Sequence, residues 1–343
     1  MDAIAKSKAQ DRSNLFKETA ARKDIAPGIV EKDFWVCWSL KRLFGLDELK
    51  GRLIFKGGTS LSKAYNVIQR FSEDIDVTID RASLGFSGEK DPANQKTGKA
   101  RDRMLDQLKD ESFRHAHDMI LPMLESDISR ALGNKKEPES AWGLELQEER
   151  DGSPTVIFTY PPAILATGAT LPDYIKPSVR IEFGARGDVW PAKDFEIGSY
   201  AADAFPEVFS VRTGTVRVLE IERTFWEKAT LLHAEFHKPS ANPRLSRHYS
   251  DIVAIFTSVH GASALARLDL LKSVAEHKAV FFRSSPAKYD EAKPGSLRLV
   301  PPEARLKELR QDFEKMKVMY FGDPPKFDWI LEQLGGLEKQ INK

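Results

Sequence analysis

Two aspartates one residue apart, Asp74 and Asp76, are the residues of this chain whose spacing points most directly to chemistry. Ile75, Val77 and Ile79 alternate with polar residues here, a period of two that is typical of a β-strand and sends both carboxylates to the same side. Two carboxylates this close repel each other unless a cation lies between them. Mg²⁺ suits the position, because it binds one or two carboxylates together with the phosphate oxygens of a substrate.

A Gly-Gly-Thr-Ser segment at residues 57–60 precedes the aspartates. The apolar run 53–55 predicts a short buried strand that Gly57 and Gly58 end. Apolar residues then recur at helical spacing, at Leu61, Ala64, Tyr65 and Ile68. The glycines are therefore expected at a helix N-terminus, where free backbone N–H groups favour a phosphate. The residues expected to bind a nucleotide are Gly57, Gly58, Thr59, Ser60 and Lys63.

Each of these features has an ordinary structural explanation when it is taken alone. A Gly-Gly pair is usually only a turn, and an Asp-x-Asp strand is usually a solvated sheet edge. Here one amphipathic helix joins the two features, and the combination favours a functional site.

The segments FKGGTSLSKAY and RFSEDIDV, with IVEKDFWVCWSL before them, resemble the AbiEii/AbiGii toxin family of nucleotidyltransferases in the DNA polymerase β superfamily. The resemblance is close in the first part of the chain and looser beyond it. It implies that the Gly-Gly turn holds a nucleoside triphosphate and that Asp74 and Asp76 bind catalytic Mg²⁺ or Mn²⁺. It also implies a third carboxylate on a later strand.

A strand that can supply the third carboxylate is expected in SVRIEFGAR. Val179, Ile181 and Phe183 alternate there with Arg180 and Glu182, so that Glu182 lies on the polar side. Glu182 is therefore our candidate for the third metal ligand, although aspartate is common at this position in the superfamily. The structural alternative is that Glu182 pairs with Arg180 or another basic residue.

Two further catalytic residues are implied by the family pattern, Lys228 and Asp251. The residues around Lys228 predict a helix with a buried stripe, and the lysine lies on or beside that stripe. Its side chain either runs along the core or directs its ammonium to a substrate phosphate. Asp251 borders the apolar face of the next expected helix and either positions Lys228 or pairs with it structurally.

Basic residues precede Asp251, and we expect Arg244 and Arg247 to bind RNA, with His248 beside them. Arginines near a nucleotide-transfer site suit the phosphate backbone of an acceptor. The net charge of the chain is only +1, so any contact with nucleic acid must use a local patch.

Composition predicts a cytoplasmic protein without a membrane span or a disulfide. The chain has no apolar run of membrane-spanning length, and its N-terminus lacks the apolar core of a signal peptide. Cys37 is the only cysteine and lies in an apolar run, which predicts a buried thiol.

The predicted fold class is α+β, a polymerase β-like nucleotidyltransferase core with a small mixed sheet plus a mainly helical C-terminal domain. A length of 343 residues suits two domains, which we place at residues 1–218, with a helical insertion, and 219–343.

By resemblance the chain is the nucleotidyltransferase toxin of a toxin–antitoxin or phage-defence system, has a cognate antitoxin, and transfers a nucleotide to RNA such as the tRNA 3′ end. Transfer to a protein or small molecule, and nucleotide binding without turnover, stay as alternatives.

Overall fold

The computed structural model describes residues 1–135, 141–169, 175–238 and 244–343. These residues form two compact units. The first, called the sheet unit, comprises residues 1–64, 72–87 and 106–218, and the second, called the helical unit, comprises residues 65–71, 88–105 and 219–343. Two short segments from the first part of the chain, 65–71 and 88–105, thus belong to the helical unit.

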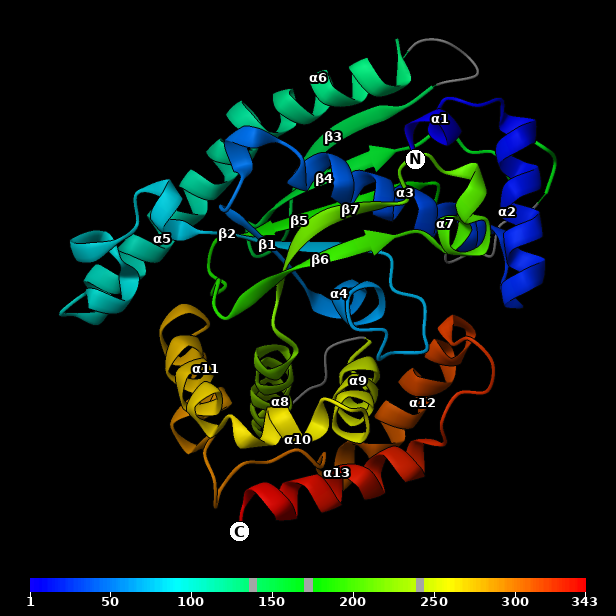
Figure 1. Ribbon diagram of the computed structural model, residues 1–343. Helices are drawn as coiled ribbons and strands as arrows, with labels where there is room; N and C mark the ends of the chain where they lie inside the picture. The colour runs from blue at the N-terminus through cyan, green and yellow to red at the C-terminus, as the bar shows by residue number, and fades with distance from the viewer. Residues whose placement is uncertain (136–140, 170–174, 239–243) are drawn as a thin grey trace. The chain divides into compact units, whose positions relative to one another are not determined.

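The sheet unit is built on a seven-stranded mixed sheet in the order β3-β4-β5-β2-β1-β7-β6 (Figure 1). Its strands are β1 Leu53–Lys56, β2 Ile75–Ile79, β3 Gly143–Glu148, β4 Pro154–Thr159, β5 Ser178–Gly184, β6 Ala192–Gly198 and β7 Thr213–Leu219. β2 is antiparallel to β1 and parallel to β5, and β1 is parallel to β7. The α+β class with a mixed sheet is confirmed.

The helices of the sheet unit are α1 Asp2–Ala5, α2 Ala9–Lys23, α3 Pro27–Phe44, α4 Gly57–Lys63, α6 Leu121–Leu132 and α7 Tyr200–Ala204, and α5 Gly98–His115 is shared between the two units. A π-helical turn, Ala116–Ile120, links α5 to α6.

The aromatic side of α3 covers one face of the sheet. Trp35 stacks on Tyr160 with ring centroids 5.4 Å apart, and Trp38 stacks on Phe158 at 5.6 Å. Both tryptophans are fully buried. Phe158 lies opposite Val179 in the β4–β5 register, so the odd-numbered residues of β5 share the α3 face. Glu182 must therefore lie on the other face, away from this core.

The same helix packs against a chain segment far away in sequence. Phe34 contacts Phe209, with ring centroids 6.4 Å apart. α3 is thus buried along most of its length, as its hydrophobic sequence requires.

A hairpin turn at Asp151 and Gly152 joins β3 to β4. Gly152 adopts a φ of +80°, which a glycine reaches without steric cost, and the Asp151 carboxylate accepts a hydrogen bond from the N–H of Ser153.

The helix expected to carry Leu61 through Ile68 is shorter than predicted. α4 ends at Lys63, and Asn66 takes a left-handed φ of 51° that breaks helical geometry. Tyr65 instead donates a hydrogen bond from its hydroxyl to the carbonyl of Leu219, and both residues belong to the helical unit. The helical spacing of Tyr65 and Ile68 was therefore coincidental.

The helical unit contains α8 Ile221–His237, α9 Ser246–Thr257, α10 Gly261–Ala266, α11 Leu268–Phe281, α12 Leu306–Met316 and α13 Phe327–Ile341. The carboxylate of Asp312 on α12 caps α9 by accepting from the N–H groups of Arg244 and Ser246, each at 2.9 Å. A residue distant in sequence thus accepts hydrogen bonds from the backbone N–H groups at the start of α9.

Candidate active site

Asp76 and Glu182 lie side by side on the sheet face opposite α3. The parallel β2–β5 register pairs them directly, and Asp74 immediately precedes β2. Cross-strand partners on one face have Cβ atoms about 4.5–5.5 Å apart. The strands therefore hold two like charges together, with a third carboxylate close by in sequence.

The pKa of the Glu182 carboxyl group is affected by these neighbouring charges. Burial, then the charges of Asp76 and Asp74, raise its pKa from the ordinary value of 4.5 to about 7, against the opposing effect of Arg180. At neutral pH, Glu182 is therefore present in both its charged and its protonated form.

Arg180 is the resident cation beside these carboxylates. Its guanidinium lies 3.3 Å from Glu182 Oε1 and 3.9 Å from Asp74 Oδ1, and it also pairs with Glu149. The pairing of Glu182 with Arg180, considered above as a structural alternative, is thus present. It does not restore the ordinary pKa of Glu182, which burial and then the charges of Asp76 and Asp74 still raise.

Gly57 lies against the Asp76 carboxylate. Its φ is +80°, and a Cβ at this position would overlap the Asp76 side chain. Both facts require glycine here. The backbone at the start of α4 is thereby brought against one of the expected metal ligands.

The Thr59 and Ser60 hydroxyls are buried and serve the turn itself. Thr59 Oγ1 donates to the carbonyl of Asp74 at 2.6 Å and contacts Ser72 Oγ at 3.0 Å, while Ser60 Oγ donates to the carbonyl of Gly57 at 2.9 Å. Thr59 thus ties α4 to the start of β2, whereas Ser60 is bonded within α4. Any phosphate contact of this segment would therefore use backbone N–H groups.

Lys63 lies in a different environment from the other predicted nucleotide-binding residues. Its ammonium is 2.7 Å from Asp33 Oδ1 on α3 and 3.9 Å from the ring centre of Tyr200. Burial would lower the pKa of Lys63, but Asp33 outweighs burial and raises it. Lys63 therefore joins α4 to α3 through its ion pair with Asp33. The residues next to Lys63 in the sequence do not reveal this partner.

Lys56 is a basic residue near the carboxylates that sequence reasoning missed. It lies opposite Asp76 in the β1–β2 register, on the same face. Gly187 approaches it closely, since a Cβ there would be 3.1 Å from Lys56 Nζ. Its position directly before Gly57, at the end of an apolar strand, is the sequence feature that could have identified Lys56.

The carboxylate face fits a divalent cation in its chemistry. Carboxylate oxygens are the ligands that Mg²⁺ and Mn²⁺ prefer. Among the described residues, the buried hydroxyls of Thr78 and Thr155 lack hydrogen-bond partners, and Thr155 lies opposite Glu182. The described residues contain no ready group of three His, Cys, Asp or Glu side chains around one point. Any metal would therefore need substrate oxygens in addition to the oxygens of Asp74, Asp76 and Glu182.

In the helical unit, Lys228 and Asp251 pair with each other. Lys228 Nζ lies 2.9 Å from Asp251 Oδ2. Arg70 donates hydrogen bonds from Nε and Nη2 to the same carboxylate, each at 2.9 Å. Burial opposes ionisation of Asp251, but Arg70 and then Lys228 outweigh it and hold its pKa well below the usual range. Arg70, in the quoted RFSEDIDV motif, is a second basic residue whose role the sequence did not reveal.

Basic groups outnumber acidic ones around Asp251. Lys228 Nζ is 3.3 Å from His248 Nδ1, and burial, then the charges of Lys228 and Arg247, hold the pKa of His248 well below its usual range. Arg70 and Lys228 both bind one carboxylate, and Arg247 lies near the neighbouring His248. This group, called the basic cluster, retains positive charge and suits an anion.

The two predicted RNA-binding arginines differ in exposure. The side chain of Arg244 is exposed and its backbone N–H bonds Asp312, whereas Arg247 is half-buried beside His248. Within the described part of the chain, Nε of Arg247 is buried without a hydrogen-bond partner. The structure therefore brings Arg247, but not the side chain of Arg244, into the basic cluster.

A family model described as nucleotidyl transferase AbiEii toxin, type IV TA system, matches residues 38–333. Among solved structures the chain is similar to MenT4, a nucleotidyltransferase toxin from Mycobacterium tuberculosis H37Rv, at 14% sequence identity and a TM-score of 0.32. That match covers 92% of this chain and 99% of the other. No curated protein matches the chain. None of the helices in the described residues is long and apolar enough to cross a membrane.

The raised pKa of Glu182 predicts how stability depends on pH. The folded state binds this proton more tightly than the unfolded chain, so its contribution is complete below pH 4.5 and is lost as pH rises through about 7. In metal-free buffer, Glu182→Gln should melt at a higher temperature than wild type at pH 8, and the difference should shrink toward pH 4.5.

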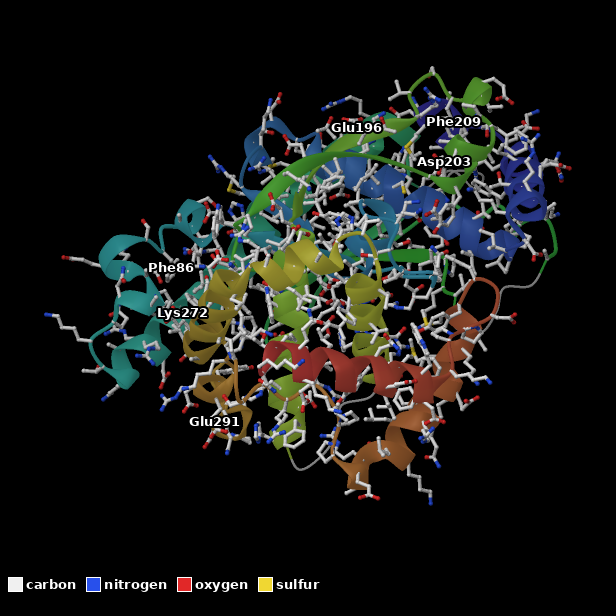
Figure 2. The ribbon with its side chains drawn as sticks, turned by 60° about the horizontal axis from the view of Figure 1, so that its bottom comes forward. Phe86, Glu196, Asp203, Phe209, Lys272 and Glu291 are labelled. Atoms are coloured by element: carbon white, nitrogen blue, oxygen red, sulfur yellow. The ribbon has the colours of Figure 1, made fainter. Side chains whose placement is uncertain are left out.

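Glu196→Gln is the matched control for this measurement. Hydrogen bonds from Thr213, then Thr215, lower the pKa of exposed Glu196 on β6 (Figure 2). Its charged form contributes stability above the ordinary carboxyl pKa, so this variant should be no more stable than wild type at pH 8. Equal melting curves of Glu182→Gln and wild type across the range would contradict the crowding of the carboxylates.

Proposed function

The chain belongs to the AbiEii family of nucleotidyl transferase toxins of type IV toxin–antitoxin systems, and we propose that it transfers a nucleoside monophosphate from a nucleoside triphosphate to RNA, such as the tRNA 3′ end. The observation that carries the proposal is the register of Asp76 against Glu182 beside Gly57. It keeps like charges together on a sheet face where stability alone would separate them. The reaction would take place in the cytoplasm and be countered by a cognate antitoxin.

Asp74, Asp76 and Glu182 would hold the divalent metal, Mg²⁺ or Mn²⁺. When bound, such a metal supplies charge stabilisation on the transferred phosphate and on the leaving pyrophosphate. The protein residues keep the carboxylates in place: Thr59 fixes the backbone of Asp74, and Arg180 limits the repulsion until the substrate arrives.

Gly57 and Gly58 would bring backbone N–H groups to the substrate phosphates, and the Lys56 ammonium would add a positive charge on the same face. Lys63 is excluded from this proposed role because its ammonium is buried against Asp33. In the helical unit, Lys228 would bind a substrate phosphate while Arg70 and Asp251 hold it in position.

The choice of RNA as acceptor is supported by Arg247 and Arg244. The net charge of +1 gives no general attraction to nucleic acid, so these local arginines must supply phosphate contacts. The deciding experiment is to incubate the protein with each labelled nucleoside triphosphate, Mg²⁺ and total cellular RNA, and then to find the labelled molecule. Label on a protein or on a small molecule, with none on RNA, would overturn the acceptor assignment.

Asp76→Asn should abolish transfer while leaving the protein folded. Removing the charge should lower turnover by about 10²–10³-fold or more, because stabilisation of transition-state charge is lost. Relief of repulsion should leave the melting temperature unchanged or higher. The rise in melting temperature on adding Mn²⁺ should also disappear.

The matched control is Asp194→Asn, which changes an exposed aspartate paired with Arg217 in the same unit. This variant should keep turnover and the response to Mn²⁺. Normal transfer by folded Asp76→Asn would remove Asp76 from the site.

Lys228→Ala should reduce activity far more than stability. Asp251 keeps its two bonds from Arg70, so we expect a loss of only about 1.5–3 kcal/mol, the usual worth of a charged hydrogen bond. Turnover and melting temperature should be measured on the same sample.

Lys272→Ala is the control, because Lys272 is an exposed lysine on α11 of the same unit (Figure 2). It should change neither quantity. A large loss of stability in Lys228→Ala with full turnover would show that Lys228 only supports the core.

The double variant Arg244→Ala and Arg247→Ala should weaken RNA binding and flatten its salt dependence. Each lost phosphate contact should reduce the slope of log K against log salt by about 0.7 for a single strand. Binding of RNA is measured between low and physiological salt, with Arg267→Ala and Arg298→Ala as a control pair of arginines from elsewhere in the helical unit. An unchanged slope in the first pair would show that these arginines do not contact RNA.

A further inference from the structure

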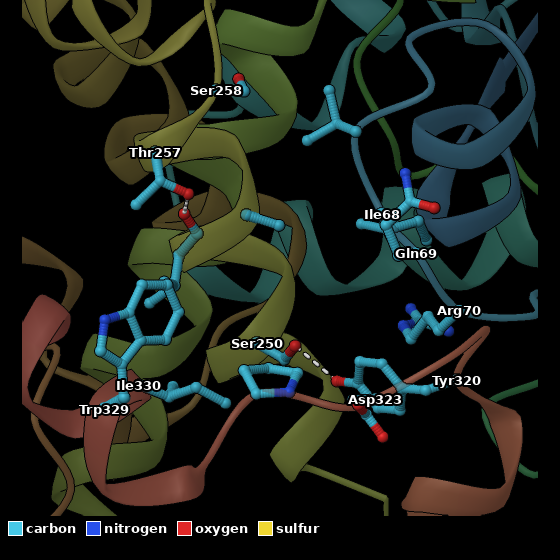
Figure 3. Close-up of a pocket in the computed structure, with 14 residues that line it drawn as sticks. Ile68, Gln69, Arg70, Ser250, Thr257, Ser258, Tyr320, Asp323, Trp329 and Ile330 are labelled. Carbon is cyan, nitrogen blue, oxygen red and sulfur yellow. Dashed lines mark hydrogen bonds between the residues drawn. The ribbon is translucent and has the colours of Figure 1, made fainter.

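The helical unit contains a cavity of about 420 Å³ that the proposed chemistry does not use. It is lined by the segment 67–70, one face of α9 and the chain from Tyr320 to Ile330 (Figure 3). Its volume falls in the range of about 300–1,000 Å³ that is common for small-ligand sites.

The backbone around the cavity is fixed by pairing between distant segments. Phe321 donates its N–H to the carbonyl of Gln69 at 3.0 Å, and Phe71 donates to the carbonyl of Met319 at 2.6 Å. Arg70 and Tyr320 form a β-bridge between these bonds. The walls are therefore held by hydrogen bonds as well as by side-chain packing.

An aromatic surface forms one wall of the cavity. Trp329 is 41% exposed, high for so large an apolar side chain, and Ile330 is fully buried next to it. Val253, Ala254 and Pro325 add apolar surface. The wall therefore offers an indole with open surface and apolar neighbours, which suits a flat ring.

Most polar groups of the lining are already engaged. Arg70 is bound to Asp251, and Ser250 contacts the Tyr320 hydroxyl, as Figure 3 shows. Thr257 donates to the carbonyl of Val253. These groups already have hydrogen-bond partners in the protein, so they do not require an anionic ligand.

Two lining side chains are available for a ligand, Asp323 and Gln69. Both are exposed, and within the described part of the chain neither makes a side-chain hydrogen bond or ion pair. Asp323 accepts hydrogen bonds and repels phosphate, whereas the Gln69 amide both donates and accepts. The side chains of Asp323 and Gln69 therefore favour a neutral ring with N–H donors over a phosphate.

We propose that this cavity binds a nucleobase of the single-stranded RNA acceptor, with its ring against Trp329 and its N–H groups donating to Asp323. The inference rests on the proposed function, because it takes RNA as the acceptor. Unpaired bases are recognised in this way, by stacking on aromatic rings and by hydrogen bonds to their edges. Guanine fits best, because its N1–H and N2–H₂ donors lie side by side opposite two carboxylate oxygens, and uracil fits least.

The cavity also has a direct connection to the basic cluster. Arg70 lines the cavity and donates a hydrogen bond to Asp251. Ser250, the residue before Asp251, also lines the cavity. A seated base would thus contact the residues that hold the partner of Lys228. This connection places base recognition and phosphate binding on adjoining residues.

The test is binding of fluorescent single-stranded oligoribonucleotides, one containing guanine and one only uracil, to the full chain. Trp329→Ala should raise the Kd for the first by about 5- to 150-fold, the range found for loss of one base stack. Asp323→Asn should weaken the guanine oligonucleotide more than the uracil one. Trp190→Ala, which removes a 58% exposed tryptophan in the sheet unit, should leave both Kd values unchanged.

A photoreactive base in the oligonucleotide provides a second measurement that does not depend on a variant folding. Crosslinks should map to the peptide that spans Asp323 and Trp329. Wild-type affinity in Trp329→Ala, or crosslinks that avoid this peptide, would overturn the proposal.

Binding and labelling distinguish failure of this inference from failure of the proposed function. If wild type labels RNA and Trp329→Ala binds it equally well, only the cavity assignment fails. If wild type transfers its nucleotide to another kind of acceptor, the RNA function fails, and the cavity assignment with it.

Discussion

The constraint on which the proposed site depends is the parallel register between β2 and β5. It places Asp76 beside Glu182 on one face, while the alternate residues Ile75 and Ile181 enter the core under α3. A slip of one residue would bury the charged pair in an aromatic core and expose apolar side chains. The burial of Trp35 and Trp38 therefore fixes the fold and the position of the carboxylates together.

A second fixed point is the buried carboxylate of Asp251. Leaving a buried charge without any partner usually costs more than the pair contributes, so Asp251 needs at least one basic partner, and it has both Arg70 and Lys228. Arg70 lies far from Asp251 in sequence and provides two of its bonds. Because Arg70 satisfies Asp251, the Lys228 ammonium can serve a substrate without leaving an unpaired buried charge.

Local patterns predicted much of the structure, whereas contacts between distant segments escaped prediction. The alternation around Asp76 and Glu182 depends on neighbours in sequence, and it appears as predicted. The burial of Lys63 depends on Asp33, and its environment could not be deduced from the residues around it. Helical spacing at Tyr65 and Ile68 failed for a related reason, because tertiary packing of residues 65–71 outweighed a weak local preference.

The net charge of +1 hides a strong local separation of charge. On the sheet face, Asp74, Asp76 and Glu182 exceed the cations beside them, so burial and repulsion raise the pKa of Glu182. In the basic cluster the imbalance is reversed, and an adjacent histidine is kept neutral. Each imbalance lowers stability unless it is compensated by a ligand of opposite charge. That cost is hard to explain by folding alone, and it favours sites kept for a cation and a phosphate.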